Sequence, residues 1–160
     1  MKIKSRDISL IVLFSALYAV MVWIFAPISF YALQFRVAGV LRPAIAKKRL
    51  LATGYAIGVV LGNLFSPFAG IHELLFMPVM SLIAGLLGHA MARMFKRSYL
   101  VAGAVIATII SLSVSWMLNQ LFILPILATL PAIFVSEQIV CLIGVVVFKA
   151  IETRYTWWET

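Results

Sequence analysis

The 160-residue chain contains few acidic residues and almost no cysteine. It has five Asp and Glu residues against thirteen Lys and Arg residues, and its single cysteine is Cys141. One thiol excludes an internal disulfide and any metal site built from several thiolates. Charged residues make up only 11% of the chain, whereas 64% of it is hydrophobic. A soluble domain of this length needs more polar surface, so the composition excludes that class.

The sequence also lacks the motifs of a catalytic or nucleotide-binding protein. It has no HEXXH or GxSxG spacing and no P-loop, which argues against an intramembrane enzyme and against an ATPase domain within this chain. Its apolar stretches carry no series of carboxylates of the kind a pump or conduction pathway would need. A net charge of +8 would suggest nucleic acid in a soluble protein. Here the basic residues flank apolar stretches, so we reject nucleic-acid binding.

The chain instead shows a regular alternation of basic clusters and long apolar runs. Eleven Lys and Arg residues form four clusters: Lys2, Lys4 and Arg6; Lys47, Lys48 and Arg49; Arg93, Lys96 and Arg97; Lys149 and Arg154. The runs 8–35, 50–71, 74–92 and 98–136 contain no Asp, Glu, Lys or Arg. A helix needs about 20 residues to cross a bilayer core, so the last run is long enough to cross twice. Basic loops stay in the cytoplasm, and the pattern therefore predicts a polytopic membrane protein.

These runs predict the positions of the membrane helices. We expect helices at about 8–25, 51–64, 73–95, 100–118 and 131–151, with Pro131 in the first turn of the last one. The first run is longer than the apolar part of a signal peptide and lacks a clear cleavage site, so we interpret it as a retained helix. Trp157 and Trp158 are suited to anchoring the C-terminus at the membrane interface.

The segment 28–46 predicts a further, unusual crossing. Without it, the second and third basic clusters would both lie outside, against the positive-inside pattern. It contains Gln34, Arg36 and Arg42-Pro43, and the part from 36 to 46 spans only about 17 Å as an α-helix. Such a segment must be buried by neighbouring helices or line a cavity. We therefore predict an all-α, single-domain bundle of six transmembrane helices over 1–160, with a short, Pro-interrupted second helix and both termini cytoplasmic.

In this topology the polar residues of the apolar runs gather in the outer half of the bundle. A charged side chain in the membrane costs about 2.5–3.5 kcal/mol on insertion scales, so each one needs a reason. The convergence predicts a pocket open to the outside, with aromatic rings that could stack on a planar ligand. The candidate substrate-binding residues are Gln34, Phe35, Arg36, Asn63, His72, Glu73, Trp116, Asn119 and Glu137.

Each candidate also has a simpler structural interpretation. Asn63 and Asn119 could be polar helix ends, and Glu73 could stabilise a helix N-terminus. Glu137 could be an ion-pair partner of Arg36 rather than a ligand contact. We expect Arg42 to be structural, bonding to the carbonyls that Pro43 frees or reaching the inner headgroups.

A small-residue pair on the first helix predicts a close helix contact. Ser15 and Ala19 lie one turn apart, which permits the near approach of another helix. That helix could belong to a partner protein or to the same bundle. The spacing alone leaves both possibilities open.

Several segments together resemble the queuosine-precursor transporter (QueT) family. They are Leu33-Gln34-Phe35-Arg36-Val37, Gly58 through Asn63-Leu64, and Ser136-Glu137-Gln138-Ile139-Val140-Cys141. The resemblance extends in order and spacing across nearly the whole chain. Three places differ from the family pattern: Ser136 replaces a glycine, Glu73 replaces an aspartate, and Ala38-Gly39 stands where an acidic residue often follows the arginine.

The resemblance implies a substrate-binding S component of an energy-coupling factor transporter in a prokaryotic cell membrane. Such a chain captures its substrate from outside, and its partners are a transmembrane coupling protein and two ATPases that use the ATP. The chain itself would then be no enzyme and would bind no cofactor. Ser15 and Ala19 resemble the motif that contacts the coupling protein, and the implied substrate is a 7-deazaguanine. The alternatives are an S component for another vitamin or nucleobase, or a membrane structural or assembly protein without transport activity.

Overall fold

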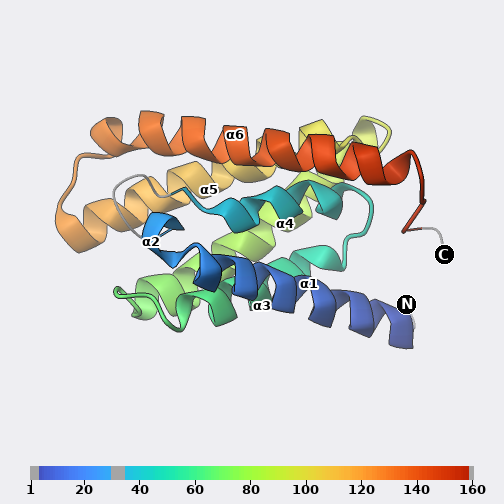
Figure 1. The fold of residues 1–160 in the computed structure, drawn as a ribbon. Helices are drawn as coiled ribbons and strands as arrows, with labels where there is room; N and C mark the ends of the chain where they lie inside the picture. The colour runs from blue at the N-terminus through green and yellow to red at the C-terminus, as the bar shows by residue number, and fades with distance from the viewer. Residues whose placement is uncertain (1–3, 30–34, 159–160) are drawn as a thin grey trace.

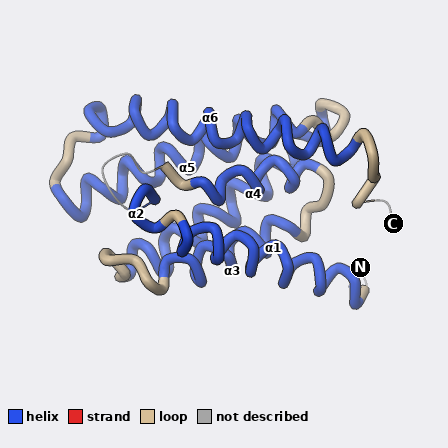
Figure 2. The backbone as a smooth tube through the Cα atoms, in the orientation of Figure 1, coloured by secondary structure: helices blue, strands red, loops and turns tan. Residues whose placement is uncertain are grey.

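A computed structural model describes residues 4–29 and 35–158, and regular structure within these ranges is entirely helical (Figure 2). The elements are α1 (Ser5–Ile24), α2 (Ala26–Ser29), the 3₁₀-helix η1 (Val37–Ala46), α3 (Leu51–Asn63), the π-helix η2 (His72–Phe76), α4 (Met77–Met94), α5 (Tyr99–Phe122) and α6 (Ile126–Glu152). This confirms the all-α prediction for the described part of the chain.

The helices form one bundle in which successive long segments run in opposite directions (Figure 1). Both ends of the chain lie at the same end of this bundle, which we call the termini end; the opposite end is the far end. α1 packs on α3, while α5 packs on both α4 and α6. η1 contacts α1, α3, α4, α5 and α6, so it lies in the middle of the bundle.

In the part of the chain that the structure describes, four segments are long and apolar enough to cross a membrane: α1, the combined η2–α4 segment His72–Met94, α5 and α6. α1 is the least buried of the four within the bundle, and leucine, isoleucine and valine side chains cover its outer face. η1 and α3 are shorter. At 2.0 Å per residue in a 3₁₀-helix and 1.5 Å in an α-helix, each spans about 20 Å.

η1 fulfils the expectation that the short, proline-containing segment is enclosed by its neighbours. Eight of its ten residues are buried, including Arg42 and Pro43. α6 can approach it closely because Gly144 has no side chain. A Cβ atom at Gly144 would lie 2.1 Å from the carbonyl oxygen of Val40. A backbone oxygen cannot move aside easily, so this glycine is what permits the contact between η1 and α6.

Two helix boundaries differ from those predicted, and one short helix was not predicted. α1 ends at Ile24, before Pro27 as expected, and the separate short helix α2 then includes Pro27. α5 continues to Phe122 and ends with Ile123 in a left-handed conformation at φ 55°. α6 begins at Ile126, so Pro131 lies inside the helix and Pro125 is the residue that precedes it. Proline within the helix lacks the N–H that would bond to the carbonyl four residues earlier, and the remaining 27-residue helix tolerates that loss.

The seam between α1 and α3 accounts for the small-residue pair of the first helix. Gly54, Gly58 and Gly62 lie one turn apart on α3, and a Cβ atom at Gly58 would be 3.1 Å from the Ser15 carbonyl. The Ser15 hydroxyl donates to the carbonyl of Gly54 at 2.9 Å. Ser15 and Ala19 are 3% and 2% exposed. In this structure the pair is therefore buried inside the bundle, which is the second of the two possibilities that the spacing left open.

Basic and aromatic side chains join the helices at the termini end. The Lys47 ammonium lies 2.8 Å from a Glu152 carboxylate oxygen and 4.2 Å from the centre of the Trp158 ring. Lys48 forms a second ion pair with Asp7 at 3.6 Å. Arg6 donates to the backbone carbonyl of Trp157 at 3.1 Å. Arg6, Lys47 and Lys48 thus contact one another's segments and the C-terminal segment, at the end of the bundle that holds both termini.

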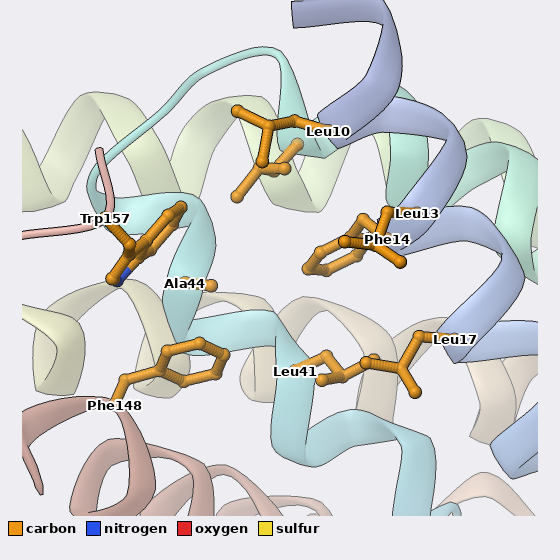
Figure 3. Close-up of a pocket in the computed structure, with 9 residues that line it drawn as sticks. Leu10, Leu13, Phe14, Leu17, Leu41, Ala44, Phe148 and Trp157 are labelled. Carbon is orange, nitrogen blue, oxygen red and sulfur yellow. The ribbon is translucent and has the colours of Figure 1, made fainter. Parts of the chain in front are cut away.

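An apolar groove of about 130 Å³ opens at the termini end, between α1 and the end of α6 (Figure 3). Its lining comes from α1, η1, α3, α6 and the segment after α6, and includes Leu10, Phe14, Leu41, Phe148 and Trp157. No charged or hydroxyl-bearing side chain lines it. It therefore offers little to orient a polar ligand, and the candidate site must lie elsewhere.

Candidate functional site

Most of the predicted site residues lie toward the far end of the bundle, on different helices. Asn63 is the last residue of α3, and His72 and Glu73 begin η2. Phe35 is partly buried and Arg36 is buried, immediately before η1. Gln34 lies outside the described residues.

Asn63 and Glu73 are in direct contact. The side-chain amide of Asn63 donates to the backbone carbonyl of Glu73 at 3.0 Å. The two residues are 0% and 3% exposed, so the contact is inside the protein. In a π-helix each backbone N–H bonds to the carbonyl five residues earlier rather than four. Carbonyls near the change of helix type can therefore be left without their usual N–H partner. The Asn63 amide satisfies one of these carbonyls and fixes the end of α3 against the start of η2.

One side-chain oxygen of each residue in this pair has no hydrogen-bond partner. Within residues 4–29 and 35–158, nothing donates to Oδ1 of Asn63 or to Oε2 of Glu73. Leaving a buried polar group unpaired costs about 1–3 kcal/mol, and more for a charged group. Single-turn π-helices are frequent at functional sites. The pair therefore has the burial and the unused bonding capacity of a ligand contact.

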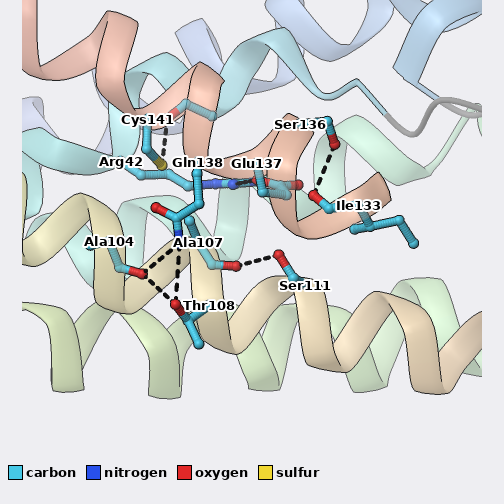
Figure 4. A network of polar contacts seen from close by, with 11 residues as sticks. Arg42, Ala104, Ala107, Thr108, Ser111, Ile133, Ser136, Glu137, Gln138 and Cys141 are labelled. Atoms are coloured by element: carbon cyan, nitrogen blue, oxygen red, sulfur yellow. Dashed lines mark hydrogen bonds and ion pairs between the residues drawn. The ribbon is translucent and has the colours of Figure 1, made fainter. Parts of the chain in front are cut away.

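Glu137 is buried on α6 and paired with Arg42 of η1 (Figure 4). Both terminal nitrogens of Arg42 donate to the carboxylate: Nη1 to Oε2, and Nη2 to Oε1 at 3.4 Å. The expectation that Arg42 bonds to freed carbonyls or reaches the headgroups is therefore wrong. The ion-pair alternative for Glu137 named Arg36, whereas the partner is Arg42.

Glycine explains why the pair forms at this position. A Cβ atom at Gly39 would lie 3.0 Å from Nη1 of Arg42 and 2.9 Å from a methyl group of Val140. The missing side chain leaves room for the guanidinium to pass between η1 and α6. The Cys141 thiol also faces the Gly39 carbonyl, at 3.9 Å.

The surroundings of the ion pair include polar residues that the sequence analysis did not identify. The guanidinium carbon of Arg42 lies 5.4 Å from the centre of the Tyr55 ring, which packs edge-on against Tyr18 at 5.2 Å. The two tyrosine hydroxyls, the Ser81 hydroxyl and Nε of Arg42 are buried without a partner in the described structure. The only sequence signal for the tyrosines was their position inside apolar runs rather than at the interface.

The remaining predicted residues lie nearer the surface. Trp116 is 40% exposed, and its ring centre lies 6.1 Å from His72 and 4.7 Å from Phe76. The Asn119 amide donates to the Leu124 carbonyl at 2.8 Å and so closes the turn after α5. This is the helix-end role that the sequence analysis weighed for it. Thus the structure brings together Asn63 with Glu73 and His72 with Trp116, but Asn119 contacts its own loop.

The chemistry available to this set of residues is recognition by hydrogen bonding and stacking. In the described ranges, no three His, Cys, Asp or Glu side chains are close enough together to hold a metal ion. The oxygens of two buried carboxylates and a buried amide can accept hydrogen bonds. The exposed Trp116 ring can contact a flat ring. They suit a small polar molecule that carries donor groups.

Comparison with known proteins identifies the family of the chain. No curated protein and no solved structure matches the chain. The family model described as QueT transporter matches residues 8–153, which is most of the sequence and includes every candidate residue. The chain therefore belongs to the QueT transporter family.

Proposed function

We propose that this chain is the substrate-binding S component of an energy-coupling factor importer and that it captures a queuosine precursor, a 7-deazaguanine, from outside the cell. The observation that carries the proposal is the family match over residues 8–153. The buried polar residues toward the far end support a small polar substrate. Energy comes from partners, since a transmembrane coupling protein and two ATPases supply the ATP hydrolysis.

The proposal includes six membrane crossings with both termini in the cytoplasm. η1 and α3 are the two short crossings, and their neighbours shield them from lipid over part of the membrane. The basic residues Lys47, Lys48 and Arg6 lie at the termini end and favour the cytoplasmic side for it. The far end, with Asn63 and Glu73, then faces outward.

In the proposed complex the 7-deazaguanine ring lies against the aromatic residues Phe35 and Trp116. Glu137 accepts hydrogen bonds from N1 and the 2-amino group of the ring. Its carboxylate has about four lone-pair sites, so the bonds from Arg42 leave capacity for a ligand. Arg36, Asn63, His72, Glu73 and Gln34 complete the site, and Gln34 complements the carbonyl edge of the ring.

A structural or assembly role is the second candidate function, and one specific observation favours it. The Arg42–Glu137 pair satisfies a buried carboxylate without any ligand. A membrane protein with a structural or assembly role could use such a pair only to hold η1 on α6. In that case Glu137 would contribute to stability and not to binding.

Two measurements on purified protein separate these functions. A thermal-shift panel of purines, 7-deazapurines and vitamins should show stabilisation by a 7-deazaguanine. Affinity purification of the chain from its native host should recover a coupling protein and ATPases. Stabilisation by an unrelated vitamin would change the substrate but keep the transporter class. No stabilisation by any compound together with no ATPase would favour the structural role.

A further inference from the structure

The apolar groove between α1 and the end of α6 has the dimensions of a single flexible chain. It extends along α1 from Leu10 to Leu17, which is about 10 Å at 1.5 Å per residue. Its volume is about 130 Å³. A helix with its side chains is about 10 Å wide, so a groove this small admits an unbranched hydrocarbon chain and not a helix.

The groove is accessible from the lipid-facing side of α1. Leu13 and Leu17 on one side of it are 65% and 46% exposed, and Phe148 and Trp157 lie on the opposite side (Figure 3). Ala44 of η1 lies between the two sides and is buried. A hydrocarbon chain can therefore enter from the bilayer, and the apolar lining gives it close contacts on several sides.

Two basic residues border the groove at the termini end, and we call them the basic rim: Arg6 and Lys48. Arg6 precedes Leu10 by one turn of α1, and its guanidinium donates to the carbonyl of Trp157, which also lines the groove, at 3.1 Å. Lys48 precedes Leu51, another lining residue, by three positions. The apolar groove thus ends at positive charge.

The chain segments around the basic rim carry a strong excess of positive charge. The segments 4–7, 47–50 and 149–158 contain seven Lys and Arg residues and only two acids. Both acids are paired with lysines, at 3.6 and 2.8 Å. A guanidinium has five N–H donors in a planar fork, so Arg6 can donate to a phosphate as well as to a backbone carbonyl. Basic pockets between membrane helices on the cytoplasmic side are suited to anionic lipid headgroups.

We infer that this groove binds an anionic phospholipid. One acyl chain lies along α1 between Leu10 and Leu17, and the phosphate lies against Arg6 and Lys48. With the termini end in the cytoplasm, the lipid belongs to the inner leaflet. The site is separate from the proposed substrate site toward the far end and does not depend on the identity of the substrate.

The test compares two lipids that differ only in the headgroup. The purified full chain in detergent is titrated with dioleoyl phosphatidylglycerol, which is anionic, or with dioleoyl phosphatidylcholine, which is zwitterionic, and bound lipid is measured by native mass spectrometry. Each basic residue near the membrane surface strengthens binding of an anionic lipid by roughly fivefold. With two residues in the basic rim, phosphatidylglycerol should bind about tenfold more tightly or better. Glycerol 3-phosphate, which has the phosphate without an acyl chain, should not bind.

Two pairs of variants separate the headgroup contact from the groove. Arg6→Gln should reduce the preference for phosphatidylglycerol by about fivefold. Arg97→Gln removes an exposed arginine outside the basic rim and should leave the preference unchanged. Leu13→Trp places a larger side chain at the groove and should weaken binding of both lipids by the same factor. Leu142→Trp is its control, because Leu142 is 49% exposed on α6 and does not line the groove.

Several outcomes would overturn the inference. They are equal binding of the two lipids, an unchanged preference in Arg6→Gln, the same loss of binding in Leu142→Trp as in Leu13→Trp, or binding of glycerol 3-phosphate as tight as that of the lipid. Unchanged lipid binding in Leu13→Trp, together with loss of assembly with a coupling protein, would assign the groove to that protein instead.

Thermal unfolding without added lipid shows whether each variant is folded. If Leu13→Trp does not fold, the comparison of Arg6→Gln with Arg97→Gln and the result with glycerol 3-phosphate still decide the inference. Binding of a 7-deazaguanine tests the proposed function separately. Its failure would overturn that function and leave the lipid site standing.

Discussion

Arg42 and Glu137 lie 95 positions apart in the sequence and meet between η1 and α6. Two charges inside an apolar bundle are tolerated because each neutralises the other and because Gly39 leaves space for the guanidinium. Removing one partner leaves an uncompensated buried charge, which costs about 3–5 kcal/mol in known cases. Replacing both partners by apolar residues is often neutral by comparison.

This contrast gives a prediction for single and double variants. Glu137→Gln and Arg42→Met should each lower the stability of the purified chain by about 3–5 kcal/mol, while the Arg42→Met, Glu137→Met double variant should lose less than either. Thermal unfolding in detergent is the measurement. Additive losses in the double variant would show that the two residues do not act as a pair.

A second residue-scale prediction concerns the end of α5. Ile123 has φ 55°, a left-handed conformation that is strained for a residue with a branched side chain. Its side chain is 87% exposed, so little packing offsets the cost of that strain. Ile123→Gly should therefore raise stability, by about 1 kcal/mol. The control is Ile143→Gly in the interior of α6, which should be destabilising. Loss of stability in Ile123→Gly would contradict the left-handed turn.

At the scale of elements, the contact between α1 and α3 can be tested by comparing substitutions at Ala16 and Ala19. Ala19 is buried and Ala16 is exposed on the same helix. Ala19→Leu should lower the thermal stability of the isolated chain because overpacking costs about 1–3 kcal/mol. Ala16→Leu should have little effect on it. If Ala19→Leu is as stable as the wild type but fails to assemble with a coupling protein, the small pair contacts the partner instead.

The extent of sequence-based prediction also differs between elements. The positions of α3, α4 and α5 follow from the charge-free runs, because membrane insertion depends on apolar length. The 3₁₀ geometry of η1 and the π-helix η2 arise from packing against neighbours, which periodicity does not record.

The residues of the site could likewise be predicted only where local sequence marks them. Glu73 and Asn63 were identified as polar residues in apolar surroundings, but the Arg42–Glu137 pair depends on a tertiary contact that no local pattern contains.

For the whole molecule, the topology can be tested with single cysteines in a Cys141→Ser background. Position 48 lies at the termini end beside Asp7, and position 68 lies in the far-end connection between α3 and η2. The positive-inside pattern predicts that an impermeant thiol reagent labels Phe68→Cys from outside and Lys48→Cys only after the membrane is opened. Labelling of position 48 in intact cells would refute six crossings with cytoplasmic termini.

Transport by the reconstituted complex tests the central claim most directly. The chain is placed in proteoliposomes with a coupling protein and two ATPases, and the uptake of a radiolabelled 7-deazaguanine is followed. If the chain is an S component, uptake should require both this chain and ATP. An excess of unlabelled 7-deazaguanine should suppress the uptake of the labelled compound. Uptake that is equal with and without the chain, or no uptake by a complex whose ATPases are active, would contradict it.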